Sequence, residues 1–167
     1  MQVNRIDHLV LTVRDIKRSV HFYESVMGMK KIEFGGGRIA LLFGSQKINL
    51  HELGNEFEPK AGNVKGGSAD LCFIISTPVK EAIEQLIEQG IPVIAGPVSR
   101  TGATGNILSA YFRDPDGNLI EVSNYIHNND CNSTSSYSGK LSSGDSGNVL
   151  IHSVAPLYSL YIPSTET

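Results

Sequence analysis

The sequence predicts an α+β fold in which two βαβββ modules form a curved mixed sheet, shaped as a cup with the helices on its outside. Two observations lead to this prediction. The segments around His8 and Asp70 both alternate apolar and polar residues as strands do, and the two residues lie 62 positions apart. The glycines that should end the helices after these strands, Gly28 and Gly90, show the same spacing of 62. The chain therefore repeats one structural plan.

The first module should continue from its first strand into a helix and three short strands. Asp15 can cap a helix that runs to about Met27, with Gly28 directly after its end. Apolar residues recur on one face of this helix at the spacing of an amphipathic α-helix. The strands at 29–34, 39–43 and 47–52 are separated by glycine-containing turns.

The second module should repeat this order after a connection over 53–66. Thr77 can cap a helix with Pro78 as its first residue. Strands are expected at 91–95, 106–113 and 118–125, with a loop over 96–105 and a tight turn at 114–117 between the last two. That loop is longer than its counterpart in the first module, so the last strand leaves the spacing of 62.

Composition indicates one globular domain at 1–126, with modules at about 4–53 and 67–126. The chain has 167 residues, of which 40% are hydrophobic, enough for a single core. Residues 127–167 are rich in serine, and we expect them to form a flexible C-terminal extension.

Charge and hydropathy exclude two classes of partner. The formal net charge of −3 comes from interspersed acids and bases, without the basic stripe of a nucleic-acid-binding protein. The apolar runs are far shorter than the roughly 20 residues of a membrane helix, and the N-terminus lacks the pattern of a signal peptide. We therefore expect a cytoplasmic protein without nucleic-acid or membrane partners.

Strand alternation sorts the side chains of four strands into two sets of faces. One set is entirely apolar and should pack on the helices: Leu9, Leu11, Val13, Ile48, Leu50, Leu71, Phe73, Ile75, Ile120 and Val122. The other set is mixed and carries four polar side chains that we expect in corresponding strand positions, on the floor of the cup: His8, His51, Asp70 and Glu121.

Two imidazoles and two carboxylates suit a divalent ion such as Zn²⁺, Ni²⁺, Co²⁺, Mn²⁺ or Fe²⁺, whose charge the carboxylates would balance. The alternative for each residue taken alone is an exposed or hydrogen-bonded side chain without a metal. Cys72, which shares the mixed face with Asp70, can be a small packed side chain or a substrate contact.

Three sequence motifs carry a resemblance to a known family. They are residues 7–15 (DHLVLTVRD), the pair Phe22-Tyr23 followed by Met27-Gly28-Met29, and residues 112–121 (FRDPDGNLIE). With these motifs the chain, over about 4–126, resembles the vicinal oxygen chelate superfamily, which includes glyoxalase I, fosfomycin-resistance thiol transferases, extradiol dioxygenases and metal-free bleomycin-resistance proteins. The resemblance implies the glyoxalase fold.

The resemblance also implies a function and a ligand set. The metal ligands would be His8, His51, Asp70 and Glu121, although glyoxalase I commonly has glutamate at the place of His51 and histidine at that of Asp70. The implied activity is that of a metal-dependent lyase or isomerase, similar to lactoylglutathione lyase. It would act on a small substrate with adjacent oxygens, such as a glutathione adduct, through an enediolate-type intermediate, with Glu121 as the catalytic base.

Two other functions remain open at this point. The chain could sequester a small molecule without metal or chemistry, as bleomycin-resistance proteins do, or be an extradiol dioxygenase. Arg38, Lys47 and Arg100 are candidates for binding a substrate carboxylate or a glutathione-like group. The resemblance implies a homodimer, and it leaves open whether the modules pair within one chain or between two.

Overall fold

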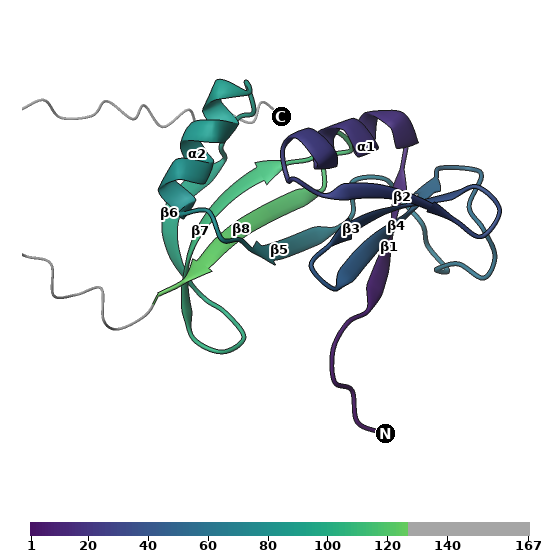
Figure 1. Cartoon of the computed structure of the whole chain (residues 1–167), viewed down its shortest axis with the longest axis horizontal. Helices are drawn as coiled ribbons and strands as arrows, with labels where there is room; N and C mark the ends of the chain where they lie inside the picture. The colour runs from purple at the N-terminus through teal and green to yellow at the C-terminus, as the bar shows by residue number, and fades with distance from the viewer. Residues whose placement is uncertain (127–167) are drawn as a thin grey trace, which may run out of the picture. The chain divides into compact units, whose positions relative to one another are not determined.

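A computed structural model describes residues 1–126, which form two βαβββ modules in succession (Figure 1). The expected extension at 127–167 lies outside the described residues. The elements of the first module are β1 (His8–Val13), α1 (Ile16–Ser25), β2 (Lys30–Phe34), β3 (Arg38–Phe43) and β4 (Gln46–Glu52). Those of the second module are β5 (Asp70–Ile74), α2 (Val79–Glu88), β6 (Ala95–Thr101), β7 (Asn106–Arg113) and β8 (Leu119–Tyr125).

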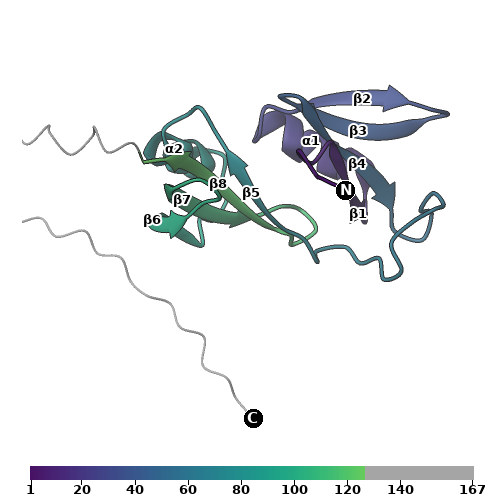
Figure 2. The ribbon, with the colours of Figure 1, turned by 90° about the horizontal axis from the view of Figure 1, so that it is seen from below.

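Each module forms its own four-stranded mixed sheet, and the two sheets have the same topology (Figures 1 and 2). Their strand orders are β1-β4-β3-β2 and β5-β8-β7-β6. The first and last strands of each module pair in parallel, and the other pairs are antiparallel. Each helix contacts three strands of its own sheet. The α+β class and the glyoxalase fold predicted from the sequence are confirmed.

Helix α1 begins where the sequence predicts and has the predicted cap, whereas α2 begins one residue later than predicted and has a different cap. The side chain of Asp15 accepts a hydrogen bond of 3.0 Å from the Arg18 N–H, so it caps α1 as expected. The cap expected from Thr77 is wrong, because Pro78 holds the N-cap position of α2 without a side-chain bond. Instead, Oδ1 of Asn124, from β8, accepts a hydrogen bond of 2.8 Å from the Val79 N–H.

The expected strand at 91–95 is also wrong, because β6 begins only at Ala95 and runs through most of the predicted loop. The Ile91 N–H still serves the helix end, where it donates to the Leu86 carbonyl, and residue 92 is a proline without an N–H. A bulge between Ala95 and Val98 then interrupts the pairing of β6 with β7.

Side chains from both modules form one hydrophobic core between the sheets and the helices. The apolar faces predicted by strand alternation lie on this core, where Leu11, Ile48, Leu50 and Ile120 are at most 4% exposed. Within the described residues, no helix is both long and apolar enough to cross a membrane.

The turn between β7 and β8 joins the second module to α1 of the first. The Tyr23 hydroxyl donates to Asp114 Oδ2 over 2.8 Å, and the Arg14 guanidinium bonds Asp116 at 3.1 Å. Asp114 and Asp116 are both buried. Their positions explain why the turn carries acidic residues. The Asp114 carboxylate accepts hydrogen bonds from donors of both modules, and the Asp116 carboxylate accepts from Arg14 and Ser19 of the first module.

Candidate functional site

His8 is the first residue of β1 and its ring is exposed. Its Nδ1 lies 2.9 Å from Asp7 Oδ1, and this hydrogen bond is the main reason why the pKa of the Asp7 carboxyl lies below its usual value. Among residues 1–126, the His8 ring makes this hydrogen bond through Nδ1 and none through Nε2. A carboxylate behind the imidazole is the usual arrangement of a histidine that binds a metal through its other nitrogen.

His51 and Glu121 do not hold equivalent positions, so the correspondence expected from the sequence is wrong. In the parallel pair β1–β4, His8 lies beside Lys47 and Thr12 beside His51, whereas Asp70 lies beside Leu119 in the pair β5–β8. His8 and His51 are thus four residues apart along neighbouring strands, or about 13 Å at the rise of a strand. The residue of the first sheet that corresponds to Glu121 is Asn49.

Two buried polar atoms on β4 lack a hydrogen-bond partner among the described residues. They are Oδ1 of Asn49 and Nδ1 of His51, which lie on the same face of the strand because they are two residues apart. The ring of Phe57 packs edge-on against the His51 ring, with centroids 5.5 Å apart. Because buried polar groups are normally paired, these two atoms indicate where a ligand or ion could bind the first sheet.

The second sheet carries Asp70 and Glu121 on the face turned away from α2. Asp70 is exposed at the start of β5, and Glu121 is half-buried on β8. The Ser123 hydroxyl donates to Glu121 Oε1 over 3.3 Å, and Ser109 lies 2.9 Å from the same hydroxyl. Both serines are completely buried, so they fix one side of the carboxylate.

Tyr111 and Cys72 flank Glu121 on the neighbouring strands. Tyr111 is its cross-strand partner on β7, and burial together with a hydrogen bond to Glu121 raises the pKa of the tyrosine. Cys72 is its partner on β5, and burial together with the Glu121 charge raises the pKa of the thiol. Cys72 is therefore a neutral thiol near neutral pH, without the character of an activated nucleophile.

Sequence reasoning missed Asn49, Tyr111 and Ser123. The position of Tyr111 could have been found by counting, since β7 and β8 form a hairpin and the residues opposite each other lie equally far from its turn. Asn49 carried no comparable signal, because the register of a parallel pair depends on strands that no tight turn connects.

In the described part of one chain, no group of three or more His, Cys, Asp or Glu side chains is placed to hold a metal ion. His8 and His51 lie on one sheet, and Asp70 and Glu121 lie on the other. The donor types suit a divalent ion, and the two unpartnered atoms on β4 point to a missing ligand. The four residues thus have the chemistry of metal ligands, but one chain holds them as two separate half-sites, His8 with His51 and Asp70 with Glu121.

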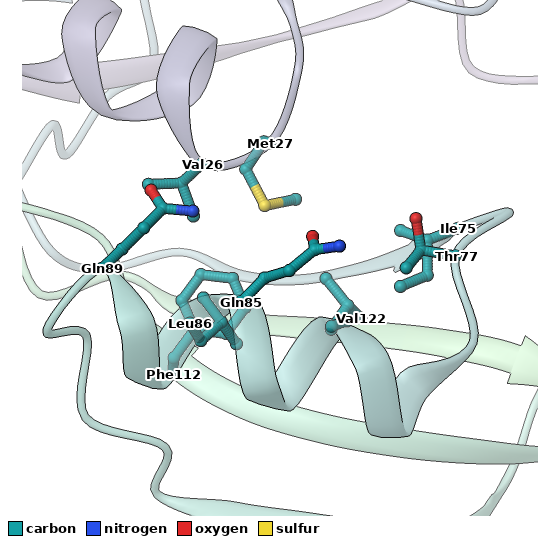
Figure 3. A pocket seen from close by; sticks show the side chains of 10 residues that line it. Val26, Met27, Ile75, Thr77, Gln85, Leu86, Gln89, Phe112 and Val122 are labelled. Atoms are coloured by element: carbon teal, nitrogen blue, oxygen red, sulfur yellow. The ribbon is translucent and has the colours of Figure 1, made fainter.

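Two cavities differ in their chemical character. One, of about 400 Å³, opens on the second sheet beside Glu121, Cys72 and Tyr111. The other, of about 100 Å³, lies between the end of α1 and α2, where Val26 and Met27 face Gln85 and Gln89 (Figure 3). All ten residues that line this second cavity are apolar or neutral, so it offers no acid–base or metal chemistry.

Comparison with known proteins finds relatives with the same fold and identifies the family of this chain. Residues 5–122 match the model of the Glyoxalase/Bleomycin resistance protein/Dioxygenase superfamily. Virulence protein STM3117 of Salmonella typhimurium is 56% identical over 75% of this chain and 88% of its own length. The glyoxalase domain-containing protein RDO1 of Mycosarcoma maydis is 54% identical over 75% of this chain and 70% of its own. The integron cassette protein VCH_CASS1 of V. cholerae is 63% identical, covers 75% of this chain and 98% of its own, and superimposes with a TM-score of 0.74.

More distant relatives have several functions. The lactoylglutathione lyase of Neisseria meningitidis is 30% identical over 70% of this chain and 88% of its own length, and the metallothiol transferase FosB of Shouchella clausii is 27% identical over 72% and 80%. The family therefore includes both lyases and transferases. From the matched family model, the shared motifs and the paired βαβββ modules, this chain is a member of the Glyoxalase/Bleomycin resistance protein/Dioxygenase superfamily.

Proposed function

We propose that this protein is a metal-dependent, glyoxalase-like lyase or isomerase that acts on a small substrate with adjacent oxygens. The observation that carries the proposal is the position of Glu121, a half-buried carboxylate beside a cavity, which accepts a hydrogen bond from Ser123 and has Tyr111 as its cross-strand neighbour. A carboxylate held in this way can act as a general base. Similarity to lactoylglutathione lyase supports the same class of reaction.

The side chains around Glu121 have distinct roles in this proposal. Glu121 removes a proton from the carbon beside a substrate carbonyl and returns it at the neighbouring atom. Ser123 and Tyr111 position the carboxylate, because each hydroxyl can donate to it. Cys72 stays protonated and forms part of the cavity wall.

Four residues would hold the metal in the proposed site: His8, His51, Asp70 and Glu121. The sheet register makes Asn49 an alternative metal ligand to His51, because Asn49 occupies the position in the first sheet that corresponds to Glu121 in the second. A bound Zn²⁺, Ni²⁺, Co²⁺, Mn²⁺ or Fe²⁺ would supply Lewis acid stabilisation of negative charge on a substrate oxygen.

A homodimer would complete this site. One chain carries the two half-sites on separate sheets, and no three of the donors meet within its described residues. A second copy can place its second sheet against the first sheet of its partner, and this arrangement forms two equal sites by symmetry.

The test is metal content and oligomeric state, measured on the full chain by elemental analysis and light scattering. We expect about one transition-metal ion per chain in a dimer, and loss of the ion in a His8→Ala, Glu121→Ala double variant. His21→Ala, which changes an exposed histidine on α1, is the matched control and should keep the metal. Comparing Asn49→Ala with His51→Ala then shows which of the two is a ligand.

Activity is tested on the hemithioacetal of methylglyoxal and glutathione, on epimerisable acyl thioesters and on catechols. Glu121→Gln should abolish turnover, and full activity in this variant would disprove the role of the base. Ligand binding that survives removal of all metal, without turnover, would favour the sequestering function instead. Oxygen uptake with catechols would favour the dioxygenase.

The motifs of the chain also resemble glyoxalase domain-containing protein 5, and we place the chain with that group. We further expect the protein in the cytoplasm, where glutathione adducts are formed.

A further inference from the structure

The cavity beside Glu121 is lined by both polar and apolar side chains. Its volume of about 400 Å³ falls within the range of small-molecule sites. Arg100, Tyr111 and Glu121 contribute polar groups to its lining, and Ile74 and Tyr125 contribute apolar surface. The cavity thus suits a small molecule with a polar head and an apolar body.

Arg100 is held in a defined orientation at this cavity. Its Nε donates to the Tyr111 hydroxyl over 3.1 Å, and its Nη1 donates to the Ser99 carbonyl over 3.0 Å. The guanidinium carbon lies 5.4 Å from the centre of the Tyr111 ring. Among residues 1–126, the remaining N–H groups of the guanidinium have no hydrogen-bond partner and can bind a ligand.

The charge of Arg100 is not neutralised by an acidic side chain in residues 1–126, since none of the ion pairs there includes it. Glu121 lines the same cavity, and Tyr111, which accepts the hydrogen bond from Arg100, is the cross-strand neighbour of Glu121. Within the described residues, Arg100 and Glu121 thus line one cavity without forming an ion pair with each other.

The other two candidate cations have aromatic partners elsewhere. The Arg38 guanidinium lies 4.7 Å from the centre of the Phe57 ring, and the Lys47 ammonium lies 3.9 Å from that of Phe34. Both belong to the first sheet, and neither lines the cavity that contains Glu121. Of the three, Arg100 alone lines the cavity that contains the proposed base.

We propose that this cavity binds small organic carboxylates with an apolar body, and that Arg100 is the residue that recognises the carboxylate. The planar guanidinium matches the two oxygens of a carboxylate. A single negative charge suits the site better than the double charge of a phosphate group, because Glu121 and Asp70 add negative charge close by. This inference deepens the proposed function by naming the substrate class.

The test is a titration of the ¹⁵N-labelled full chain, followed by NMR at the Arg100 Nε–H signal, with metal removed by a chelator. Three probes share a phenyl ring and differ in charge: benzoate, neutral benzamide and phenylphosphonate. We expect benzoate to shift the Arg100 signal and to bind more tightly than either of the other two. Arg100→Gln should weaken benzoate binding at least about tenfold, as expected for the loss of a charge-assisted hydrogen bond.

Two further variants distinguish the loss of the Arg100 charge from an effect of the substitution on folding. Arg100→Lys keeps the charge without the planar fork and should bind benzoate with intermediate affinity. Arg113→Gln is the matched control, because Arg113 is also exposed and also bonds a backbone carbonyl, that of Gly117, but does not line the cavity. It should bind benzoate like the unchanged protein.

Several results would overturn the inference: no binding of benzoate, equal binding of benzamide, tighter binding of phenylphosphonate, or unchanged binding in Arg100→Gln. Because the titration needs neither metal nor turnover, it fails or succeeds independently of the role proposed for Glu121. A Glu121→Gln variant that binds benzoate but is inactive would support both proposals. If Glu121→Gln retains activity while Arg100→Gln loses benzoate binding, only the proposed role of Glu121 as the base is refuted.

Discussion

Replacing Tyr23 by phenylalanine should destabilise the protein by about 2 kcal/mol, because it removes one hydrogen bond that joins the two modules. The Tyr23 ring is completely buried and its hydroxyl donates to Asp114 Oδ2 over 2.8 Å. Burial and the nearby Asp114 charge raise the pKa of the tyrosine far above its usual range, so the hydroxyl is always a donor.

The magnitude follows from the partners of Asp114. A hydrogen bond to a charged group contributes about 1.5–3 kcal/mol. After the substitution, Asp114 still accepts from the backbone of Asp116 and from the backbone and side chain of Asn118, at 2.7–2.9 Å. These remaining bonds still stabilise the Asp114 carboxylate, so the loss of unfolding free energy should lie toward the lower end of that range.

The assay is urea unfolding followed by far-ultraviolet circular dichroism, with a double-mutant cycle of Tyr23→Phe and Asp114→Ala. We expect the effect of Tyr23→Phe to fall by at least about 1 kcal/mol in the Asp114→Ala background. Tyr125→Phe, at a partly exposed tyrosine, should change the unfolding free energy by less than about 0.5 kcal/mol. Additive effects of the two substitutions, or a loss below about 0.5 kcal/mol in Tyr23→Phe, would refute the reasoning.

Three further predictions concern the site and the loops. In a Cys131→Ser background, alkylation of Cys72 should follow a thiol pKa above the ordinary value of 9.0, and Glu121→Gln should lower that pKa, since the Glu121 charge helps to raise it; no change would place Glu121 away from the thiol. The Glu56 carboxyl accepts hydrogen bonds from the Gly54 N–H and the Lys60 ammonium, which lower its pKa from 4.5 to about 2. Its contribution to folding should therefore be complete above about pH 4.5 and disappear as the pH falls toward 2; an NMR titration of Glu56 with a midpoint near 4.5 in the folded chain would contradict this. Gly67→Ala should destabilise the protein by more than about 1 kcal/mol, measured by urea unfolding, because φ is +78° there and the new methyl group would collide with the Asp116 carbonyl; a neutral effect would show that the backbone can shift.

The sequence by itself determined the elements and their faces. Apolar alternation identified the residues that pack on the helices, such as Leu11 and Ile120, because a side chain at every second position must point to the same side of a strand. Asp15 marked a helix start because its side chain bonds a backbone N–H only three residues away. Such signals are local, so a single segment contains them completely.

Only the tertiary structure decided how distant segments meet. Alternation placed His51 on the correct side of β4, yet it could not show that His51 lies beside Thr12, or that Asn49 corresponds to Glu121. Asn124 replaces Thr77 as the cap of α2 for the same reason, since its carbonyl oxygen reaches Val79 from a strand 45 residues later. Register and long-range caps depend on hydrogen bonds between segments that no turn connects, and these bonds form only when the chain is folded.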